Sequence, residues 1–310
     1  MVSDTALIFN PQKITAAKLE KALAKLGHKE IAVHATDRET GGQAIARELI
    51  ELGYRRLLVA GGDGTLRNVV EAASGSDCAL GIIPLGTGNI LARNLRLPLT
   101  LEAALKRAVN GKEYVVDLGL ARAVLPDGII RDYLFTGIGG VGMDARLMQN
   151  TQSELKRRIG WVAYIEGGFR SLPFKFEKFD VTYDNNFRTL KSYSLLVGNV
   201  GFLPGAISMM PDARLDDGKL DVAAIGPRRI WNWVDFLSRI TWQNRVVRPL
   251  ALGRRWMDQT ANVKTLENLA SSRIRIRPHS LAPMQLDGDP IGEVVEVDFS
   301  IKPKSLKVLV

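Results

Sequence analysis

The sequence predicts an α/β protein in two parts, a domain built on a parallel sheet followed by a larger domain of antiparallel strands. The chain has 310 residues, about twice the length of a typical single domain. Up to about residue 110, short apolar runs alternate with helical patterns, as in a parallel sheet that carries helices on both faces. Beyond that point, long extended runs are separated by Asp- and Asn-rich turns, which is typical of antiparallel pairing.

In the first part we expect strands and helices to alternate. The strands are short and mostly apolar, at Ala6–Phe9, Ile31–His34, Arg56–Ala60 and Ala79–Ile83. The helices are segments whose apolar residues recur every three or four positions, at Ile14–Leu26, Gly42–Leu52, Leu66–Ala73 and Ile90–Leu95.

In the second part, turn signals separate the expected strands. These signals are Pro126-Asp127-Gly128, Asp184-Asn185-Asn186, Asp216-Asp217-Gly218 and Asp287-Gly288. Helical patterns interrupt this part at about 153–170 and 228–242. We place the boundary between 110 and 120, which gives an α/β domain at 1–115 and a β-rich domain at 116–295.

The composition excludes several classes of protein. A hydrophobic content of 46% is sufficient for a packed core and excludes a disordered chain. The single cysteine excludes an intramolecular disulfide, and none of the three histidines is spaced for a zinc site. The net charge of +9 favours an anionic partner: a nucleotide, a nucleic acid or an acidic membrane surface. With no long apolar run and no basic secretory-type N-terminus, we expect a cytoplasmic protein.

A glycine-rich corner follows the third expected strand, where Gly61, Gly62, Asp63, Gly64 and Thr65 lead into a helix. Glycines let backbone N–H groups approach a phosphate, and a helix N-terminus adds partial positive charge. The pattern predicts phosphate binding. Asp63 would either orient the loop or hold Mg²⁺, and Thr65 would either contact phosphate or cap the helix. The alternative is an ordinary strand–turn–helix corner.

A second glycine corner, with Gly86, Thr87 and Asn89, follows the next strand. Because parallel strands open their carboxyl ends onto one crevice, we expect the two corners to hold one nucleotide from two sides. Asn10 follows the first strand and Thr36 the second, so both are expected at the same sheet edge. The sequence has neither a P-loop pattern nor the motif set of protein kinases, which excludes those two enzyme classes.

Taken together and in order, these segments and several later ones resemble the motifs of the diacylglycerol kinase catalytic superfamily, which includes bacterial lipid kinases and sphingosine kinases. The matching segments are Asn10-Pro11, Gly61–Thr65, Pro84–Asn89, Gly137–Ala145, Gly198-Asn199 with Pro211–Val222, and Gln285–Gly288. The resemblance implies an N-terminal nucleotide-binding α/β domain and a C-terminal β-sandwich, the architecture of NAD and diacylglycerol kinases. It also implies that a last strand, at 296–310, returns to the first domain.

The resemblance further implies roles for single residues in ATP and metal binding. Thr36, Gly61 to Thr65 and Thr87 would contact ATP. A divalent metal ion would be held by Asp217, with backbone carbonyls near Arg214 and Lys219.

The last of these motifs would supply the general base. The family usually closes it with Asp-Gly-Glu, whereas this sequence has Asp287-Gly288-Asp289, so the base remains open between Asp287 and Asp289. The resulting hypothesis is a lipid kinase: the two corners would hold ATP, Mg²⁺ would bind near Asp63, and the base would take the proton of a lipid hydroxyl.

The partner implied is a lipid at a membrane surface. The acceptor remains open among diacylglycerol, monoacylglycerol, phosphatidylglycerol, undecaprenol and a sphingoid base, and no motif specifies an oligomeric state. The segment 228–242 combines tryptophans, aliphatic residues and arginines, which suits peripheral docking at the inner membrane face. The alternative for this segment is a core-packed helix with a basic edge.

Three other functions compete with the lipid kinase. They are a soluble NAD kinase-like enzyme, a lipid- or nucleotide-binding relative that has lost catalysis, and a nucleic-acid binder. We disfavour the last because the arginines are scattered over both halves and no recognition motif accompanies them.

Overall fold

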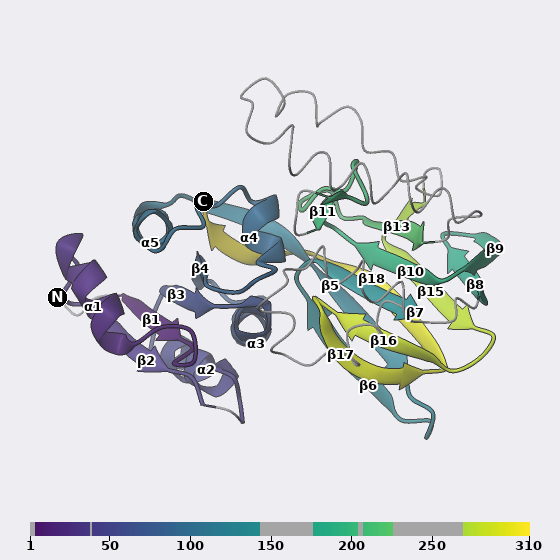
Figure 1. The fold of residues 1–310 in the computed structure, drawn as a ribbon, viewed down its shortest axis with the longest axis horizontal. Helices are drawn as coiled ribbons and strands as arrows, with labels where there is room; N and C mark the ends of the chain where they lie inside the picture. Colours follow the sequence, from purple (N-terminus) through teal and green to yellow (C-terminus); the bar gives the residue numbers. More distant parts are fainter. Residues whose placement is uncertain (1–3, 38, 143–175, 204–206, 226–268) are drawn as a thin grey trace.

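The protein is described by a computed structural model that covers residues 4–37, 39–142, 176–203, 207–225 and 269–310. An α/β half and a β-rich half lie side by side and are joined by long strands that enter both (Figure 1). The expected helices at 153–170 and 228–242 lie outside the described residues. No helix in the described part of the chain is long and apolar enough to span a bilayer.

The α/β half contains four parallel strands in the order β2-β1-β3-β4. Their bounds are β1 Thr5–Phe9, β2 Ala32–Ala35, β3 Arg56–Gly61 and β4 Ala79–Pro84. The helices of this half are α1 Ala16–Lys25, α2 Gln43–Glu51, α3 Asp63–Ala73, α4 Ile90–Asn94 and α5 Leu101–Asn110. This arrangement confirms the predicted parallel α/β class.

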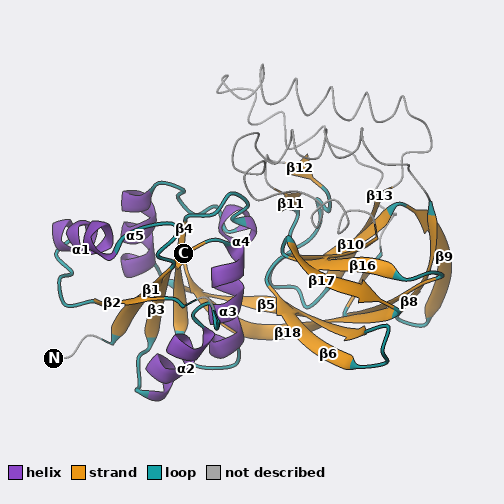
Figure 2. Ribbon diagram, turned by 60° about the horizontal axis from the view of Figure 1, so that its bottom comes forward, coloured by secondary structure: helices purple, strands orange, loops and turns teal. Residues whose placement is uncertain are grey.

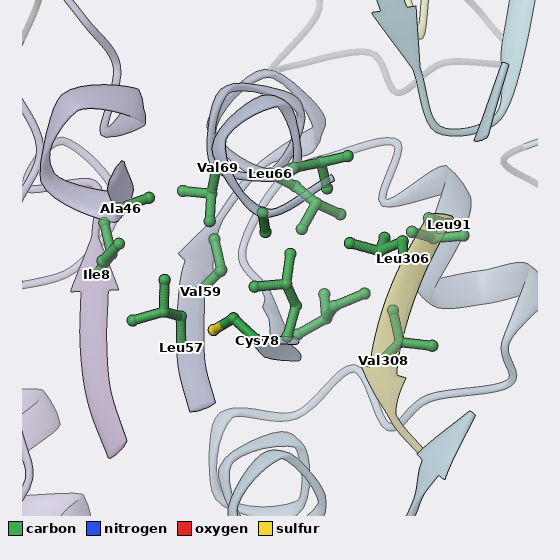
Figure 3. Close-up of a cluster of buried hydrophobic side chains, with 14 of the residues drawn as sticks. Ile8, Ala46, Leu57, Val59, Leu66, Val69, Cys78, Leu91, Leu306 and Val308 are labelled. Atoms are coloured by element: carbon green, nitrogen blue, oxygen red, sulfur yellow. The ribbon is translucent and has the colours of Figure 1, made fainter. Parts of the chain in front are cut away.

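Helices cover both faces of this sheet, as the uninterrupted apolar strands predict. Alternate residues of a strand point to opposite faces, so Ile8 packs with α2 and α3 whereas Leu7 packs with α1 and α5. Figure 3 shows the first of these clusters, in which Leu306 and Val308 of the last strand join the core beneath α3. The two layers of helices lie on opposite sides of the sheet in Figure 2.

Two features of this half differ from the expectation. The helix α5 was not predicted; its apolar residues Ala104, Leu105 and Ala108 follow helical spacing and are buried against the sheet. The helix α3 begins at Asp63, three residues before the expected start, so the glycine-rich corner forms its first turn.

The β-rich half consists of two stacked sheets and a separate two-stranded one, β11-β12. Its strands are β5 Glu113–Val124, β6 Ile130–Phe135, β7 Ile138–Gly142, β8 Glu177–Tyr183, β9 Asn186–Ser192, β10 Ser194–Gly198, β11 Phe202–Leu203, β12 Ile207–Ser208, β13 Leu220–Ile225, β14 Ala270–Ser271, β15 Arg273–Pro278, β16 Ala282–Leu286, β17 Asp289–Val294 and β18 Glu296–Leu309. One sheet has the order β14-β13-β10-β7-β16-β17, and β5, β6, β18, β15, β8 and β9 face it. Phe135, Phe179 and Phe299 of one sheet pack with apolar side chains of the other, including Val197, Val222 and Leu286, in one buried cluster. The antiparallel class predicted for this half is confirmed.

The last strand runs through both halves. β18 pairs antiparallel with β5 along most of its length, and with β15 from Arg273 to Ile276. Near its end, Lys307 and Val308 pair in parallel with β4. One sheet is therefore continuous from β2 to β9, which ties the β-rich half to the edge of the α/β half.

Candidate nucleotide and phosphoryl-transfer site

The two glycine corners touch through their backbones. A Cβ atom on Gly86 would lie 2.8 Å from the Cα of Gly62, a distance that real side chains do not reach. The N–H of Leu85 donates to the carbonyl oxygen of Gly61 at 2.8 Å, which continues the pairing of β3 and β4 into the corners. Glycine is therefore required where the corners meet.

Asp63 joins the first corner to the second. Its Oδ2 accepts the N–H of Asn89 and its Oδ1 accepts the N–H of Ile90, both at 2.7 Å. The carboxylate thus satisfies the first free N–H groups of α4. Burial, and less strongly the charge of Asp287, raise the pKa of Asp63 to about 6. Both oxygens of this carboxylate therefore bind the second corner, which favours the orienting role of the two that the sequence left open.

The second corner is held in shape by its own asparagine. Asn89 has a left-handed backbone with φ of 49°, and its side chain bonds both the N–H of Gly86 at 2.9 Å and the carbonyl of Gly86 at 2.7 Å. The Nε of Arg93 donates to the carbonyl of Gly88 at 2.8 Å. Thr87 lies at the exposed tip of the corner. Asn89 therefore shapes the corner, and Thr87 faces outward from it.

The residues expected from the first two strands lie at the same sheet edge. Asn10 follows β1, and its Nδ2 donates to the Oγ1 of Thr65 at 3.3 Å. The N–H of Thr36 donates to the carbonyl of Phe9 at 2.8 Å, which extends the pairing of β1 and β2. Thr65 packs beneath Gly61, where a Cβ would approach it to 2.6 Å. Asn10, Thr36 and the two glycine corners are therefore gathered at the carboxyl ends of adjacent strands.

Asp287 lies in the turn between β16 and β17 and is 5% exposed. Its Oδ2 accepts the N–H of Thr136 at 2.7 Å and the Oγ1 of the same residue at 3.0 Å. Its Oδ1 accepts the N–H groups of Gly137 at 2.8 Å and Ile138 at 3.0 Å. Burial raises the pKa of Asp287, and these hydrogen bonds oppose the rise. Both carboxylate oxygens are thus occupied by the corner between β6 and β7.

Asp289, two residues later, is in a different environment. Its side chain is 47% exposed, and its Oδ2 pairs with the Nη2 of Arg67 on α3 at 3.0 Å. The same Oδ2 lies 3.1 Å from the position that a Cβ on Gly64 would occupy. The fold therefore brings the final acidic motif to the first turn of α3, beside the first glycine corner.

The predicted metal residues form a separate loop before β13. Asp217 is exposed, and its Oδ1 accepts the N–H of Lys219 at 3.1 Å. Arg214 pairs with Asp216 at 3.3 Å. Burial, together with the negative charges of Asp217 and Asp212, raises the pKa of Asp221 to about 6. Among the described residues, no hydrogen bond joins this loop directly to the glycine corners.

Sequence reasoning missed Asp117, which organises that loop. Asp117 is buried in β5; its Oδ2 accepts the N–H of Gly218 at 2.8 Å and its Oδ1 accepts the N–H of Lys304 at 2.7 Å. The Nδ2 of the buried Asn199 donates to the backbone carbonyl of Asp117 at 3.0 Å. A lone carboxylate within the apolar run Val115–Leu118 was the available signal.

Comparisons with known proteins identify the family of this chain. Residues 5–121 match the family model of the diacylglycerol kinase catalytic domain, and residues 137–310 match that of the YegS C-terminal NAD kinase beta sandwich-like domain. A Pseudomonas aeruginosa protein named "Probable lipid kinase YegS-like" is 29% identical over 290 residues, covering 90% of this chain and 84% of the relative. A diacylglycerol kinase of Staphylococcus epidermidis is 31% identical over 220 residues, covering 68% of this chain and 67% of the relative.

Solved structures share the fold. A diacylglycerol kinase from Bacillus anthracis superposes with a TM-score of 0.73 at 19% identity, covering 98% of this chain and 96% of that one. The yeast NADH kinase complexed with NADH superposes with a TM-score of 0.54 at 11% identity, covering 100% of this chain and 84% of that one. At these identities the likeness concerns the fold alone.

Proposed function

Because the chain belongs to the diacylglycerol kinase family, we propose that it transfers the γ-phosphoryl group of ATP to a hydroxyl of a lipid such as diacylglycerol. One observation carries the proposal: the first turn of α3 is flanked by the second glycine corner on one side and by Asp289 on the other. A phosphate site and a carboxylate that is not enclosed are the two elements that phosphoryl transfer to an alcohol needs.

The nucleotide would bind at the gathered carboxyl ends of β1 to β4. The N-terminus of α3 offers free N–H groups and partial positive charge to the phosphates, and Gly62 and Gly86 let the second corner lie directly beside it. Asn10, Thr36 and Thr87 border the same edge and would add polar contacts. Asp63 acts indirectly, because its carboxylate keeps the two corners together.

We assign the general base to Asp289 rather than Asp287. Four donors occupy the oxygens of Asp287, and the residue is buried, so the group has no access to a substrate hydroxyl. Asp289 is half exposed, and its Oδ1 has no hydrogen-bond partner among the described residues. In the proposed step the lipid oxygen bonds to the γ-phosphorus, the bond from that phosphorus to the bridging oxygen breaks, ADP leaves, and the hydroxyl proton passes to Asp289.

The donor set of the loop before β13 fits a hard divalent cation such as Mg²⁺. Asp217 has a carboxylate oxygen that accepts no hydrogen bond from the described residues, and backbone carbonyls of Arg214 and Lys219 stand on either side of it in the chain. Negative charge gathers nearby: after burial, the charges of Asp217 and Asp212 are what raise the pKa of Asp221. A Mg²⁺ ion bound in this loop would neutralise the charge of the loop. A Mg²⁺ ion at the nucleotide would neutralise the charge of the phosphates. Asp117 would hold the loop in place.

The acceptor would be reached at a membrane surface. A net charge of +9 favours association with anionic lipid headgroups. The aromatic and basic segment 228–242 lies outside the described residues, so this part of the proposal depends on the sequence. Sedimentation with vesicles that contain or lack acidic phospholipid tests it: binding only to the acidic vesicles, and loss of that binding at high salt, is the expected result.

A single experiment separates the lipid kinase from its competitors. The purified protein is incubated with γ-labelled ATP, Mg²⁺, a total lipid extract and NAD, and the labelled product is identified by mass. We expect a phosphorylated lipid. Labelled NADP would instead identify an NAD kinase-like enzyme, and ATP binding without any labelled product would identify an inactive relative.

A further inference from the structure

Arg67 connects the two halves of the protein at the candidate site. It lies on α3, two residues after Thr65, and its side chain is 16% exposed. One terminal nitrogen, Nη1, donates to the backbone carbonyl of Leu286 at 3.0 Å, and the other, Nη2, pairs with Oδ2 of Asp289 at 3.0 Å. One guanidinium therefore holds both the backbone and the carboxylate of the turn between β16 and β17.

This ion pair differs from most others in the described residues. The pair of Lys25 with Glu102, for example, joins side chains that are 62% and 76% exposed, and exposed pairs contribute little to stability. Arg67 is largely desolvated, and its planar fork makes two directed bonds, which fixes an orientation as well as supplying charge. Such a contact is suited to holding one carboxylate in one position.

We propose that Arg67 is the positioning residue for Asp289, holding its carboxylate at a set distance from the glycine corner that begins α3. The inference rests on the proposed kinase function. Arg67 occupies Oδ2 and leaves Oδ1 without a hydrogen-bond partner in the described part of the chain, so Oδ1 is the atom that takes the substrate proton. Since Arg67 and Gly64 belong to the same helix, the ion pair ties the carboxylate to the element that begins at the phosphate site.

The short side chain of Asp289 makes this support effective. Its two rotatable bonds would otherwise let the half-exposed carboxylate adopt several orientations. A misplacement of about 1 Å at a reacting group can reduce turnover roughly 100-fold. Arg67 therefore raises kcat through Asp289 without touching the substrate, and it leaves the affinity for ATP unchanged.

A double-mutant cycle tests the assignment in the full-length protein. The variants are Arg67→Met, which keeps the length of the side chain but removes its charge and both bonds, Asp289→Asn, and the two combined. Arg67→Lys retains the positive charge but lacks the planar guanidinium that makes both bonds. Arg47→Met is the matched control, because Arg47 is an exposed arginine on α2 without an ion pair among the described residues. For each variant, kcat, KM for the lipid, the dissociation constant for ATP and the melting temperature are measured.

We expect Arg67→Met to lower kcat by about 10- to 100-fold, as for loss of a charged hydrogen bond, with ATP affinity within about twofold of the wild type. In the Asp289→Asn background the same change should have almost no further effect, Arg67→Lys should restore part of kcat, and Arg47→Met should match the wild type. Equal losses in both backgrounds, an unchanged kcat, or a parallel loss of ATP affinity would overturn the inference while the kinase function stands. A wild-type protein that transfers no phosphoryl group would overturn both.

Discussion

Asp63 in the α/β half and Asp287 in the β-rich half perform the same structural task, and Asp289 does not. Each of the first two carboxylates accepts backbone N–H groups from a neighbouring corner: Asp63 from residues 89 and 90, Asp287 from residues 136 to 138. Asp289 accepts a single arginine and remains half exposed. The comparison indicates that the enclosed aspartates hold corners together, and that the open one is available for chemistry.

The two enclosed aspartates also differ in how far away in the chain their partners lie. Asp63 reaches residues 26 and 27 positions away, within a single pair of strand–helix units. Asp287 reaches residues about 150 positions away, in the connection between β6 and β7. The contacts of Asp63 form between segments that are close in the chain, whereas those of Asp287 exist only when the β-rich half is assembled.

Among variants of these three aspartates, we expect Asp289→Asn to have the largest effect on turnover. Loss of a general base should lower kcat by about 100- to 10 000-fold, with only a small change in melting temperature because the asparagine oxygen can still accept a hydrogen bond from Arg67. Steady-state kinetics and thermal melts measure the two effects. A variant that retains full turnover would show that Asp289 is not the base.

For Asp287→Asn we expect the opposite pattern. The amide group keeps one acceptor oxygen and places an NH₂ against donors that the carboxylate now satisfies, so the free energy of unfolding should fall by about 3–5 kcal/mol. Denaturant unfolding gives this value. A variant of wild-type stability and without turnover would instead make Asp287 the catalytic group.

Asp63→Asn tests the environment of Asp63 through the pH dependence of the free energy of unfolding. The pKa of Asp63 is raised from 3.8 to about 6 in the folded protein, which therefore binds this proton more tightly than the unfolded chain. Its contribution to stability is greatest below about pH 4 and is lost as the pH rises to about 6, a change of up to about 3 kcal/mol.

The asparagine variant lacks this titration. Its free energy of unfolding should therefore decline less than that of the wild type between about pH 4.5 and about pH 7 in urea titrations. Parallel pH dependence in the two proteins would contradict the environment assigned to Asp63.

The smallest effect is expected for substitutions where the two glycine corners touch. Gly86→Ala places a Cβ 2.8 Å from the Cα of Gly62, which forces the two backbones apart, whereas Gly62→Ala meets Gly86 at the ordinary distance of 3.4 Å. We expect Gly86→Ala to lower the free energy of unfolding by about 1–3 kcal/mol and to weaken ATP binding more than Gly62→Ala does. Calorimetry and ATP titration measure this order; equal losses in the two variants would contradict it.

Much of the α/β half was predictable from the sequence, because its signals are local. Apolar strands, helical periodicity and glycine corners identify four strands, four helices and the sheet edge where Asn10 and Thr36 lie. The pattern still missed α5 and placed the start of α3 at Leu66 rather than Asp63, since glycine and aspartate are poor helix formers that here occupy a first turn. The antiparallel class of the second half followed from its turn signals, and β18 pairs with both β4 and β5.

The roles of the acidic residues were not predictable in the same way. The sequence presents Asp63, Asp287 and Asp289 as three similar carboxylates beside glycines, and it gives no sign that Arg67 reaches Asp289. A carboxylate's chemistry depends on its burial and on the donors that surround it, and here those donors come from segments far away in the chain. Residue pattern alone was enough for the class of fold, the two glycine corners and the family. Which aspartate is enclosed and which is open followed only once the folded chain had brought its partners together.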